Sequence, residues 1–206
     1  MNLVLLSVFI PTFFFVSITP GMCMTLALSL GLRVGYLRTL WMMLGELIGI
    51  GIVSLAAALG VASIIDSYPW LFAMLKYAGG AYLLYLGISM WRSKGSLALT
   101  AHNDEQNSGS NVQLMLQGFV TAVANPKGWA CMISLLPPFI DSSPSLATQL
   151  ASLVAVILII EFICMSIYSI GGKSLKHLLS HSDNIRTMNR ISGALMVGVS
   201  FWLVMS

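Results

Sequence analysis

Charged side chains inside long apolar stretches are the first residues in this chain that could do chemistry. Glu46, Lys127 and Glu161 each lie within a mostly apolar run. An isolated charge at the centre of a bilayer costs roughly 2.5–3.5 kcal/mol on insertion scales. These groups must therefore be paired, protonated or hydrated, and residues of this kind mark ion or substrate pathways. A structural ion pair between Lys127 and one of the glutamates is the alternative interpretation.

Two short segments, one in each half of the chain, carry a proline where an apolar run would otherwise continue as a helix. They are Thr19-Pro20-Gly21 and Asn125-Pro126-Lys127. A proline lacks the N–H that would bond the carbonyl four residues earlier, so we expect the Val16 and Ala122 carbonyls to be free. Broken helices of this kind bind ions and charged substrates in transporters. A plain proline kink without a ligand is the alternative.

The elements that must position these residues are membrane-spanning helices. Apolar residues make up 57% of the 206 residues and charged residues only 8%, against about 25% charged in soluble domains. A spanning helix needs roughly 20 mostly apolar residues. Six runs qualify, at 3–28, 39–64, 68–91, 114–138, 146–170 and 190–205. We therefore predict an all-α membrane protein of six transmembrane helices, with residues 1–206 forming a single integral membrane domain.

The placement of the basic residues predicts how the chain is oriented. Eight of the ten Lys and Arg residues fall in three alternate connections, and none falls in the two others. The basic connections are 29–38, 92–113 and 171–189, the last with Arg190 at its edge. By the positive-inside rule these connections face the cytoplasm. With an even number of spans, both termini then lie outside.

The connection 92–113 divides the chain into two halves of three spans. Its residues 96–111 are polar and unpatterned, so we expect a flexible cytoplasmic linker. Because three is odd, the second half enters the membrane with the opposite orientation, as in inverted-repeat transporters. The two matching prolines favour such a repeat, with spans one and four broken. Glu46, however, has no acidic counterpart, since the equivalent position is Ser152.

Glycines in the second and third predicted spans indicate close helix packing. Gly45 and Gly49 place two small residues four apart on one face of span two. Span three lacks side chains at Gly79, Gly80 and Gly87. Faces of small residues let membrane helices approach closely. We expect tight contacts at both places.

Three cysteines, Cys23, Cys131 and Cys164, lie in apolar runs and are expected to be small buried residues. Cys23 and Cys131 also allow an alternative function, a thiol-redox carrier with one cysteine in span one and one in span four. They stand three and five residues after the prolines, whereas such carriers place the cysteine directly after the proline. A metal-cation exporter is a second alternative, against which the scarcity of in-span Asp, His and paired Cys argues.

The ordered set of motifs resembles one known family. The motifs are Ile18-Thr19-Pro20-Gly21, Leu30-Gly31-Leu32-Arg33-Val34-Gly35-Tyr36, Leu44-Gly45-Glu46, Tyr82-Leu83-Leu84-Tyr85-Leu86-Gly87 and Asn125-Pro126-Lys127. With this order and spacing, nearly the whole chain resembles the lysine and homoserine/threonine exporters (LysE/RhtB type), which include leucine exporters. The family usually continues Pro-Gly-Pro, whereas Met22 replaces the second proline here. The resemblance implies a small bacterial plasma-membrane protein that exports amino acids, driven by the proton gradient, and not an enzyme.

An amino acid crossing lipid needs partners for both of its charges. Its carboxylate could meet helix N-terminal N–H groups near Gly21 or Gly128, or Lys127, and its ammonium could meet a glutamate or a freed carbonyl. The predicted substrate-binding and proton-coupling residues are Thr19, Pro20, Gly21, Glu46, Asn125, Pro126, Lys127 and Glu161. The expected partners are a neutral amino acid of the threonine, homoserine or leucine type, protons and the bilayer. No cofactor, metal or nucleic acid is expected, and homo-oligomer formation stays open.

Overall fold

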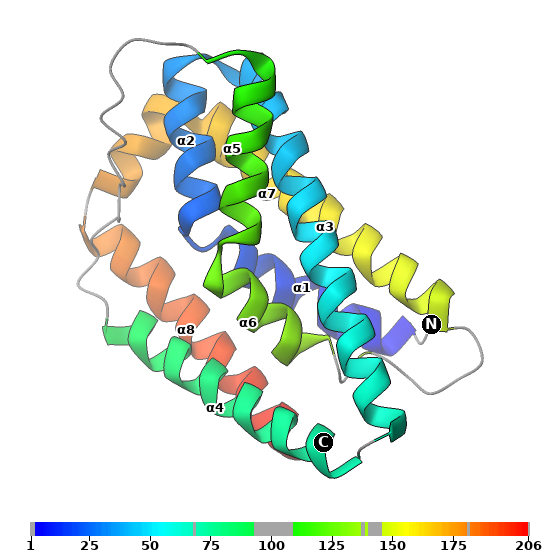
Figure 1. Cartoon of the computed structure of the whole chain (residues 1–206). Helices are drawn as coiled ribbons and strands as arrows, with labels where there is room; N and C mark the ends of the chain where they lie inside the picture. Colours follow the sequence, from blue (N-terminus) through cyan, green and yellow to red (C-terminus); the bar gives the residue numbers. More distant parts are fainter. Residues whose placement is uncertain are drawn as a thin grey trace.

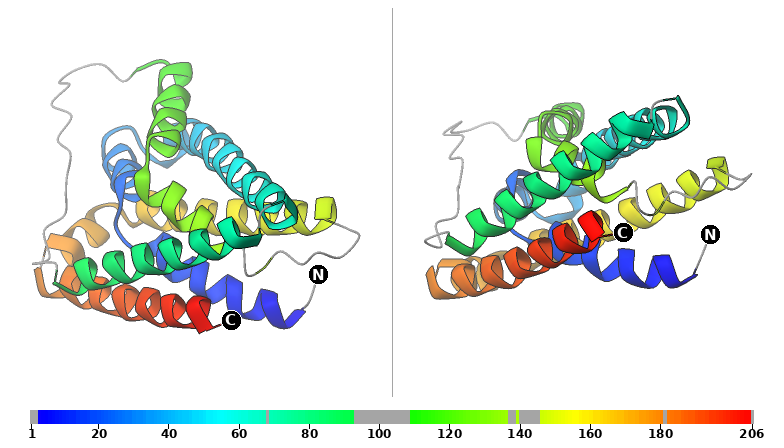
Figure 2. Two further views of the ribbon diagram at one scale, coloured as in Figure 1. Left: turned by 60° about the horizontal axis from the view of Figure 1, so that its bottom comes forward. Right: turned by 90° about the horizontal axis from the view of Figure 1, so that it is seen from below.

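A computed structural model describes residues 3–67, 69–92, 109–136, 139, 146–180 and 182–205. In this part of the chain the structure is all-helical, as predicted (Figure 1). Its helices are α1 (Leu3–Ile18), α2 (Met22–Arg33), α3 (Tyr36–Ser67), α4 (Pro69–Arg92), α5 (Asn111–Val123), α6 (Pro126–Leu135), α7 (Leu146–Ser180) and α8 (Ser182–Met205). In both views of Figure 2, α5 and α8 lie on opposite sides of the molecule.

The first and fourth predicted spans are each broken into two helices. The axes of α1 and α2 bend by 59° at the segment around Pro20. The second break lies between α5 and α6, and Pro126 is the first residue of α6. A proline is tolerated there because the first N–H groups of a helix have no intrahelical partner. Both breaks expected from the prolines are therefore confirmed.

The connection predicted at 171–189 is largely helical, while the candidate membrane span Leu146–Gly172 ends within two residues of the predicted span 146–170. The helix α7 continues to Ser180, with a non-helical Gly172 at φ 42° inside it, and α8 begins at Ser182. Hydropathy detects only the apolar part of a helix, whereas these two helices continue into polar sequence. At the linker, α4 reaches Arg92 and α5 begins at Asn111, and residues 93–108 lie outside the described residues.

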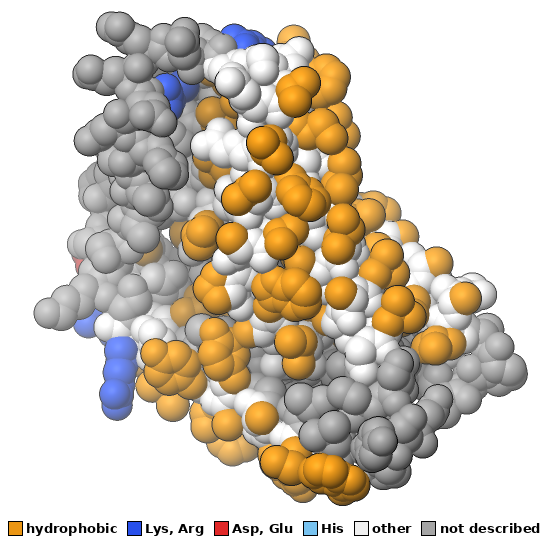
Figure 3. All heavy atoms as spheres, viewed as in Figure 1, with side chains coloured by type: hydrophobic (Ala, Val, Ile, Leu, Met, Phe, Trp, Pro, Cys, Tyr) orange, Lys and Arg blue, Asp and Glu red, His pale blue; other side chains and the backbone are white. Residues whose placement is uncertain are grey.

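Within the described residues, two segments are long and apolar enough to cross a membrane by themselves. They are Tyr36–Gly60 of α3 and Leu146–Gly172 of α7, and the bent pair Leu6–Ile18 with Met22–Arg33 is a third candidate. The outer face of α3 carries an exposed apolar stripe at steps of three and four, formed by Trp41, Leu44, Ile48, Ile52, Leu55 and Leu59. In Figure 3 apolar side chains cover one face of the molecule, and Lys and Arg lie at its edges. This surface suits lipid contact.

Two helix pairs cross at glycines, where backbones touch. A Cβ atom on Gly45 of α3 would lie 1.8 Å from the Met115 carbonyl oxygen of α5. In the pair α4 and α8, which run side by side in Figure 1, a Cβ on Gly193 would lie 2.6 Å from the Gly87 carbonyl oxygen. Only glycine fits at such distances, so the close packing expected at Gly45 and Gly87 is confirmed.

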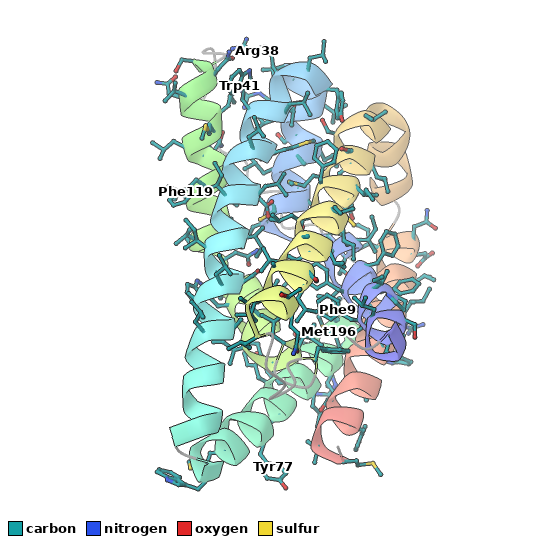
Figure 4. The ribbon with its side chains drawn as sticks, turned by 90° about the vertical axis from the view of Figure 1, so that its right-hand side faces the viewer. Phe9, Arg38, Trp41, Tyr77, Phe119 and Met196 are labelled. Carbon is teal, nitrogen blue, oxygen red and sulfur yellow. The ribbon has the colours of Figure 1, made fainter. Side chains whose placement is uncertain are left out.

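The buried core lies between these crossings. Phe9 stacks on Phe13 at a ring-centroid distance of 5.6 Å and meets Phe139 edge-on at 4.9 Å. Figure 4 places Phe9 and Met196 in the interior, with Arg38 at one end of the molecule and Tyr77 at the other. Phe9 and Met196 belong to one cluster of buried apolar side chains, and α1 contacts both α7 and α8.

One hydrogen bond joins two of the predicted cytoplasmic connections. The Arg38 guanidinium donates to the Gly109 carbonyl oxygen over 2.8 Å. Gly109 directly precedes Ser110, which caps the N-terminus of α5 through a capping box with Gln113. The start of α3 and the start of α5 therefore lie at the same end of the molecule, as the charge pattern requires.

Candidate functional site

The site is built around the end of α1. The last carbonyls of any helix lack intrahelical donors, and Pro20 removes one more N–H. The Lys127 ammonium, which reaches in from α6, donates to the Val16 carbonyl oxygen over 2.9 Å and to that of Thr19 over 3.4 Å. The carbonyl predicted to be freed at Val16 thus has a cationic partner from the other half of the chain.

Hydroxyl groups from two further helices satisfy the neighbouring carbonyls. Tyr168 of α7 donates to the Ile18 carbonyl oxygen over 2.7 Å. The Phe15 carbonyl oxygen accepts from the Thr19 hydroxyl at 2.7 Å and from Ser192 of α8 at 3.3 Å. Thr19 and Ser192 also bond to each other at 2.5 Å. The break is therefore held open by α6, α7 and α8 together.

Two buried carboxyl groups face this break. Glu46 on α3 is 1% exposed and Glu161 on α7 is 9% exposed. Ser17 donates its hydroxyl hydrogen to Glu161 Oε1. Glu46 Oε2 is buried without a hydrogen-bond partner among the described residues, and the Cys23 thiol lies beside this glutamate. A buried carboxyl oxygen without a donor is costly, so its presence points to a ligand, proton or water at this place.

The second break contributes a capped helix N-terminus. Asn125 Oδ1 accepts from the backbone N–H of Lys127 at 3.1 Å, which caps α6. The Asn125 amide also contacts the Cys23 sulfur at 3.6 Å. The Ala122 carbonyl oxygen accepts from the Asn125 N–H at 3.2 Å. The expectation that Ala122 offers a free carbonyl is therefore wrong, because the chain tightens into a turn before the proline.

The N-terminus of α2 has no such cap. Its N-cap residue is Gly21, in extended conformation and without a side-chain hydrogen bond. The first N–H groups of a helix carry a partial positive charge and bind anions readily. Gly21, Met22 and Cys23 line the same cavity as the two glutamates. The cavity is thus lined by an uncapped helix N-terminus at α2 and by residues of the carbonyl end of α1.

The cavity enclosed by these groups has a volume of about 40 Å³. A water molecule needs roughly 10–15 Å³ of such space, so a few waters fit and an amino acid does not. Its polar lining includes Thr19, Gly21, Glu46, Asn125, Lys127 and Glu161, together with Ser17 and the thiols of Cys23 and Cys131. Six of the eight predicted site residues are therefore brought together, and Pro20 and Pro126 form the adjacent breaks.

The structure favours a carbonyl partner for Lys127 over the alternative of a structural ion pair. Its ammonium donates to Val16 and Thr19, not to a carboxylate, although it is near enough to act electrostatically on Glu161. Among the described residues, no group of three or more His, Cys, Asp or Glu side chains could hold a metal ion.

The sequence analysis missed Ser17, Tyr168 and Ser192. Serine and tyrosine occur throughout the predicted spans, so the residue type alone does not mark these three as members of the site. Only Ser17, two residues before the Thr19-Pro20-Gly21 segment, could have been suspected from its position.

Comparison with known proteins extends over nearly the whole chain. The family model of the LysE type translocator matches residues 14–206. A homoserine/homoserine lactone efflux protein of Salmonella typhimurium is 25% identical over 182 residues, 88% of this chain and 86% of that protein. A leucine efflux protein of Enterobacter is 28% identical over 187 residues, 90% of this chain and 88% of that protein. An uncharacterized membrane protein of Vibrio cholerae is 26% identical over 187 residues, covering 91% and 90% of the two chains. No solved structure matches the chain.

Proposed function

Because the chain belongs to the LysE type translocator family, we propose that it exports neutral amino acids across the bacterial inner membrane in exchange for protons. Membership of a translocator family makes it a membrane transport protein, not an enzyme. The relatives named for homoserine and leucine efflux support a neutral amino acid as the substrate. The observation that carries the proposal is one oxygen of a buried carboxyl group, Glu46 Oε2, that has no hydrogen-bond partner among the described residues and belongs to a cavity between two broken helices.

The proposed architecture is a single domain of six spans in two inverted repeats, with both termini outside. One repeat is α1–α2, α3 and α4, and the other is α5–α6, α7 and α8. Each begins with a helix broken near a proline. Corresponding helices of the two repeats pack on each other, α3 on α7 and α4 on α8. Such contacts are compatible with an internal two-fold axis between the repeats, which supports this arrangement.

The cavity supplies the chemistry that a zwitterion needs. The carboxylate would bind at the uncapped N-terminus of α2, near Gly21, and the ammonium near the carboxyl groups and the carbonyl oxygens of α1. Apolar side chains complete the lining, among them Phe13, Ile50 and Met132. An apolar lining favours a neutral side chain on the substrate over a charged one. Thr19, Pro20, Asn125, Pro126 and Lys127 would shape and position this site.

Charge balance supplies the coupling. The cavity holds two carboxyl groups, Glu46 and Glu161, and one ammonium, that of Lys127. With both carboxyl groups ionised, it lacks one positive charge, which either a proton or the substrate's ammonium can supply. The two occupants exclude each other at the same carboxylate, because a carboxyl group that has taken up a proton has no negative charge left to pair with the ammonium. Such exclusion produces exchange of an outward-moving amino acid for an inward-moving proton.

The test is transport by inverted membrane vesicles, in which export appears as uptake. Vesicles with and without the protein are energised and given labelled homoserine, threonine, leucine or lysine. We expect the protein to accelerate uptake of one or more of the neutral amino acids, and a protonophore to abolish that gain. If none of the neutral amino acids is taken up faster, the export proposal is wrong. If uptake is faster but unaffected by the protonophore, only the proton coupling is wrong.

A further inference from the structure

Two backbone carbonyls at the end of α1 share one donor group. The Val16 and Thr19 oxygens lie 2.9 Å and 3.4 Å from the Lys127 nitrogen. An ammonium carries three N–H donors and so can serve both oxygens at once. Lys127 Nζ is the nitrogen of a primary ammonium, so the two oxygens already accept from a group of this kind.

The neighbouring carbonyls do not compete for this donor. Those of Phe15 and Ile18 accept from hydroxyl groups of Thr19, Ser192 and Tyr168. The Val16 and Thr19 oxygens therefore depend on a donor that comes from the cavity side. A buried carbonyl left without a donor costs about 1–3 kcal/mol, so any group that displaces Lys127 has to replace its hydrogen bonds.

The cavity also holds a buried carboxyl oxygen that lacks a hydrogen bond among the described residues. This atom is Glu46 Oε2, and Glu46 lines the same cavity as Lys127. A lysine side chain is a flexible four-carbon stem with a compact charge at its tip. If another ammonium took the carbonyl pair, the Lys127 ammonium would satisfy this carboxyl group, and no buried charge would lose its partner.

We propose that the Val16 and Thr19 carbonyl oxygens form a primary-ammonium subsite that Lys127 and the α-ammonium of the transported amino acid occupy in turn. The identity of the second occupant rests on the proposed export function. In the structure the lysine holds the subsite, and the substrate takes it when the lysine moves to Glu46. The lysine is thus an internal competitor of the substrate.

Direct binding to the purified full-length protein tests the subsite without transport. The probe is n-butylammonium chloride, which has a primary ammonium and no carboxylate, and tetramethylammonium chloride is the cation without N–H donors. A site blocked nine-tenths of the time by a tethered competitor binds an added ligand about ten-fold more weakly. We therefore expect Lys127→Met to bind n-butylammonium about ten-fold or more tightly than wild type, and no gain for tetramethylammonium.

The matched control is Arg92→Met, which removes a positive charge from the exposed end of α4. It should bind n-butylammonium with wild-type affinity. Equal affinities for wild type and Lys127→Met, or an equal gain for tetramethylammonium, would overturn the subsite.

A second measurement covers the case in which Lys127→Met does not fold. Wild-type protein is tested in inverted vesicles with the amino acid that it transports, or, if none is found, by thermal unfolding of the purified protein. n-Butylammonium should compete with the amino acid, or raise the unfolding midpoint, while tetramethylammonium does neither. Absence of any n-butylammonium effect sinks the subsite. Absence of amino-acid transport with n-butylammonium binding intact sinks only the export function.

Discussion

Glu46 is the residue on which the proposed coupling depends. Its carboxyl group is buried on α3, and one of its oxygens has no hydrogen-bond partner among the described residues. Glutamine has the same size but cannot take up and release a proton. We predict that Glu46→Gln abolishes efflux driven by a pH gradient, while the protein still inserts and still exchanges internal for external amino acid. Efflux is measured against external pH in energised vesicles.

Glu161→Gln is the matched variant, because Glu161 already accepts a hydrogen bond from Ser17. We expect it to weaken transport but to retain a response to the pH gradient. If both variants keep full pH-driven efflux, neither glutamate carries the proton, and the coupling mechanism is wrong even if the chain exports amino acids. If Glu161→Gln alone loses the response, the proton site is Glu161.

The cysteines give a test of the rival thiol-redox function. Cys23 and Cys131 are buried free thiols that line the cavity. Replacing both by alanine removes the two thiols that line the cavity but leaves the carboxyl groups, Lys127 and both helix breaks. We predict that export is largely retained at normal protein levels. Loss of export in the double variant, with each single variant also inactive, would favour the redox carrier.

At this scale the sequence predicts the backbone of the site better than its partners. Pro20 and its missing N–H identify the Val16 carbonyl without any structure, since the effect is local. The partners Tyr168 and Ser192 come from distant parts of the chain, so only tertiary packing brings them to α1. The prediction of a free Ala122 carbonyl is wrong, because a local turn before Pro126 brings the Asn125 N–H to that oxygen as a donor.

The crossing of α3 and α5 is the element contact that tolerates least change. A Cβ on Gly45 would lie 1.8 Å from the Met115 carbonyl oxygen, so α5 would have to move away. Overpacking of this kind costs about 1–3 kcal/mol or more. We predict that Gly45→Ala lowers the thermal unfolding midpoint of the purified protein.

Gly60→Ala in the same helix is the control, since a Cβ there meets no atom within 4 Å. Alanine is the better helix former by about 1 kcal/mol, so this variant should keep or raise the midpoint. Equal midpoints for the two variants would show that α3 and α5 do not pack as described.

The elements themselves follow from sequence to different degrees. The apolar runs of α3 and α4 gave bounds within three residues, because in these helices the apolar part is nearly the whole helix. The predicted spans 146–170 and 190–205 are shorter than the helices that contain them, since α7 and α8 continue into polar residues. The close approach at Gly45 was predicted as a small-residue face, but its partner α5 was not.

The orientation of the whole molecule is tested by labelling. The Arg38–Gly109 hydrogen bond puts the start of α3 and the start of α5 at one end, and basic residues cluster in the connections there. We predict that a membrane-impermeant thiol reagent labels Asp66→Cys in intact cells, but labels Asp104→Cys only in inverted vesicles. Labelling of position 104 in intact cells would reverse or invalidate the topology.

The cavity volume sets a requirement on the whole molecule. About 40 Å³ accommodates water but no amino acid, so α1, α2, α3, α6 and α7 cannot all keep their positions when substrate binds. At the glycine crossings of α3 with α5 and of α4 with α8, backbone atoms of the two helices lie in close contact. Helix pairs of this kind can move as units, which is how inverted-repeat transporters open alternately to each side.

The Lys127–Val16 hydrogen bond has a genetic consequence, because the need for Lys127 arises from the presence of Pro20. Lys127 supplies the donor that Pro20 withholds from the Val16 carbonyl. Pro20→Ala would restore a backbone donor for that carbonyl, so the fold should then depend less on the lysine. We predict epistasis: Lys127→Met should destabilise the wild type more than it destabilises Pro20→Ala, as a double-mutant cycle of unfolding midpoints would measure. Among related chains, loss of this proline should therefore precede or accompany loss of this lysine, although the two stand in opposite halves of the sequence.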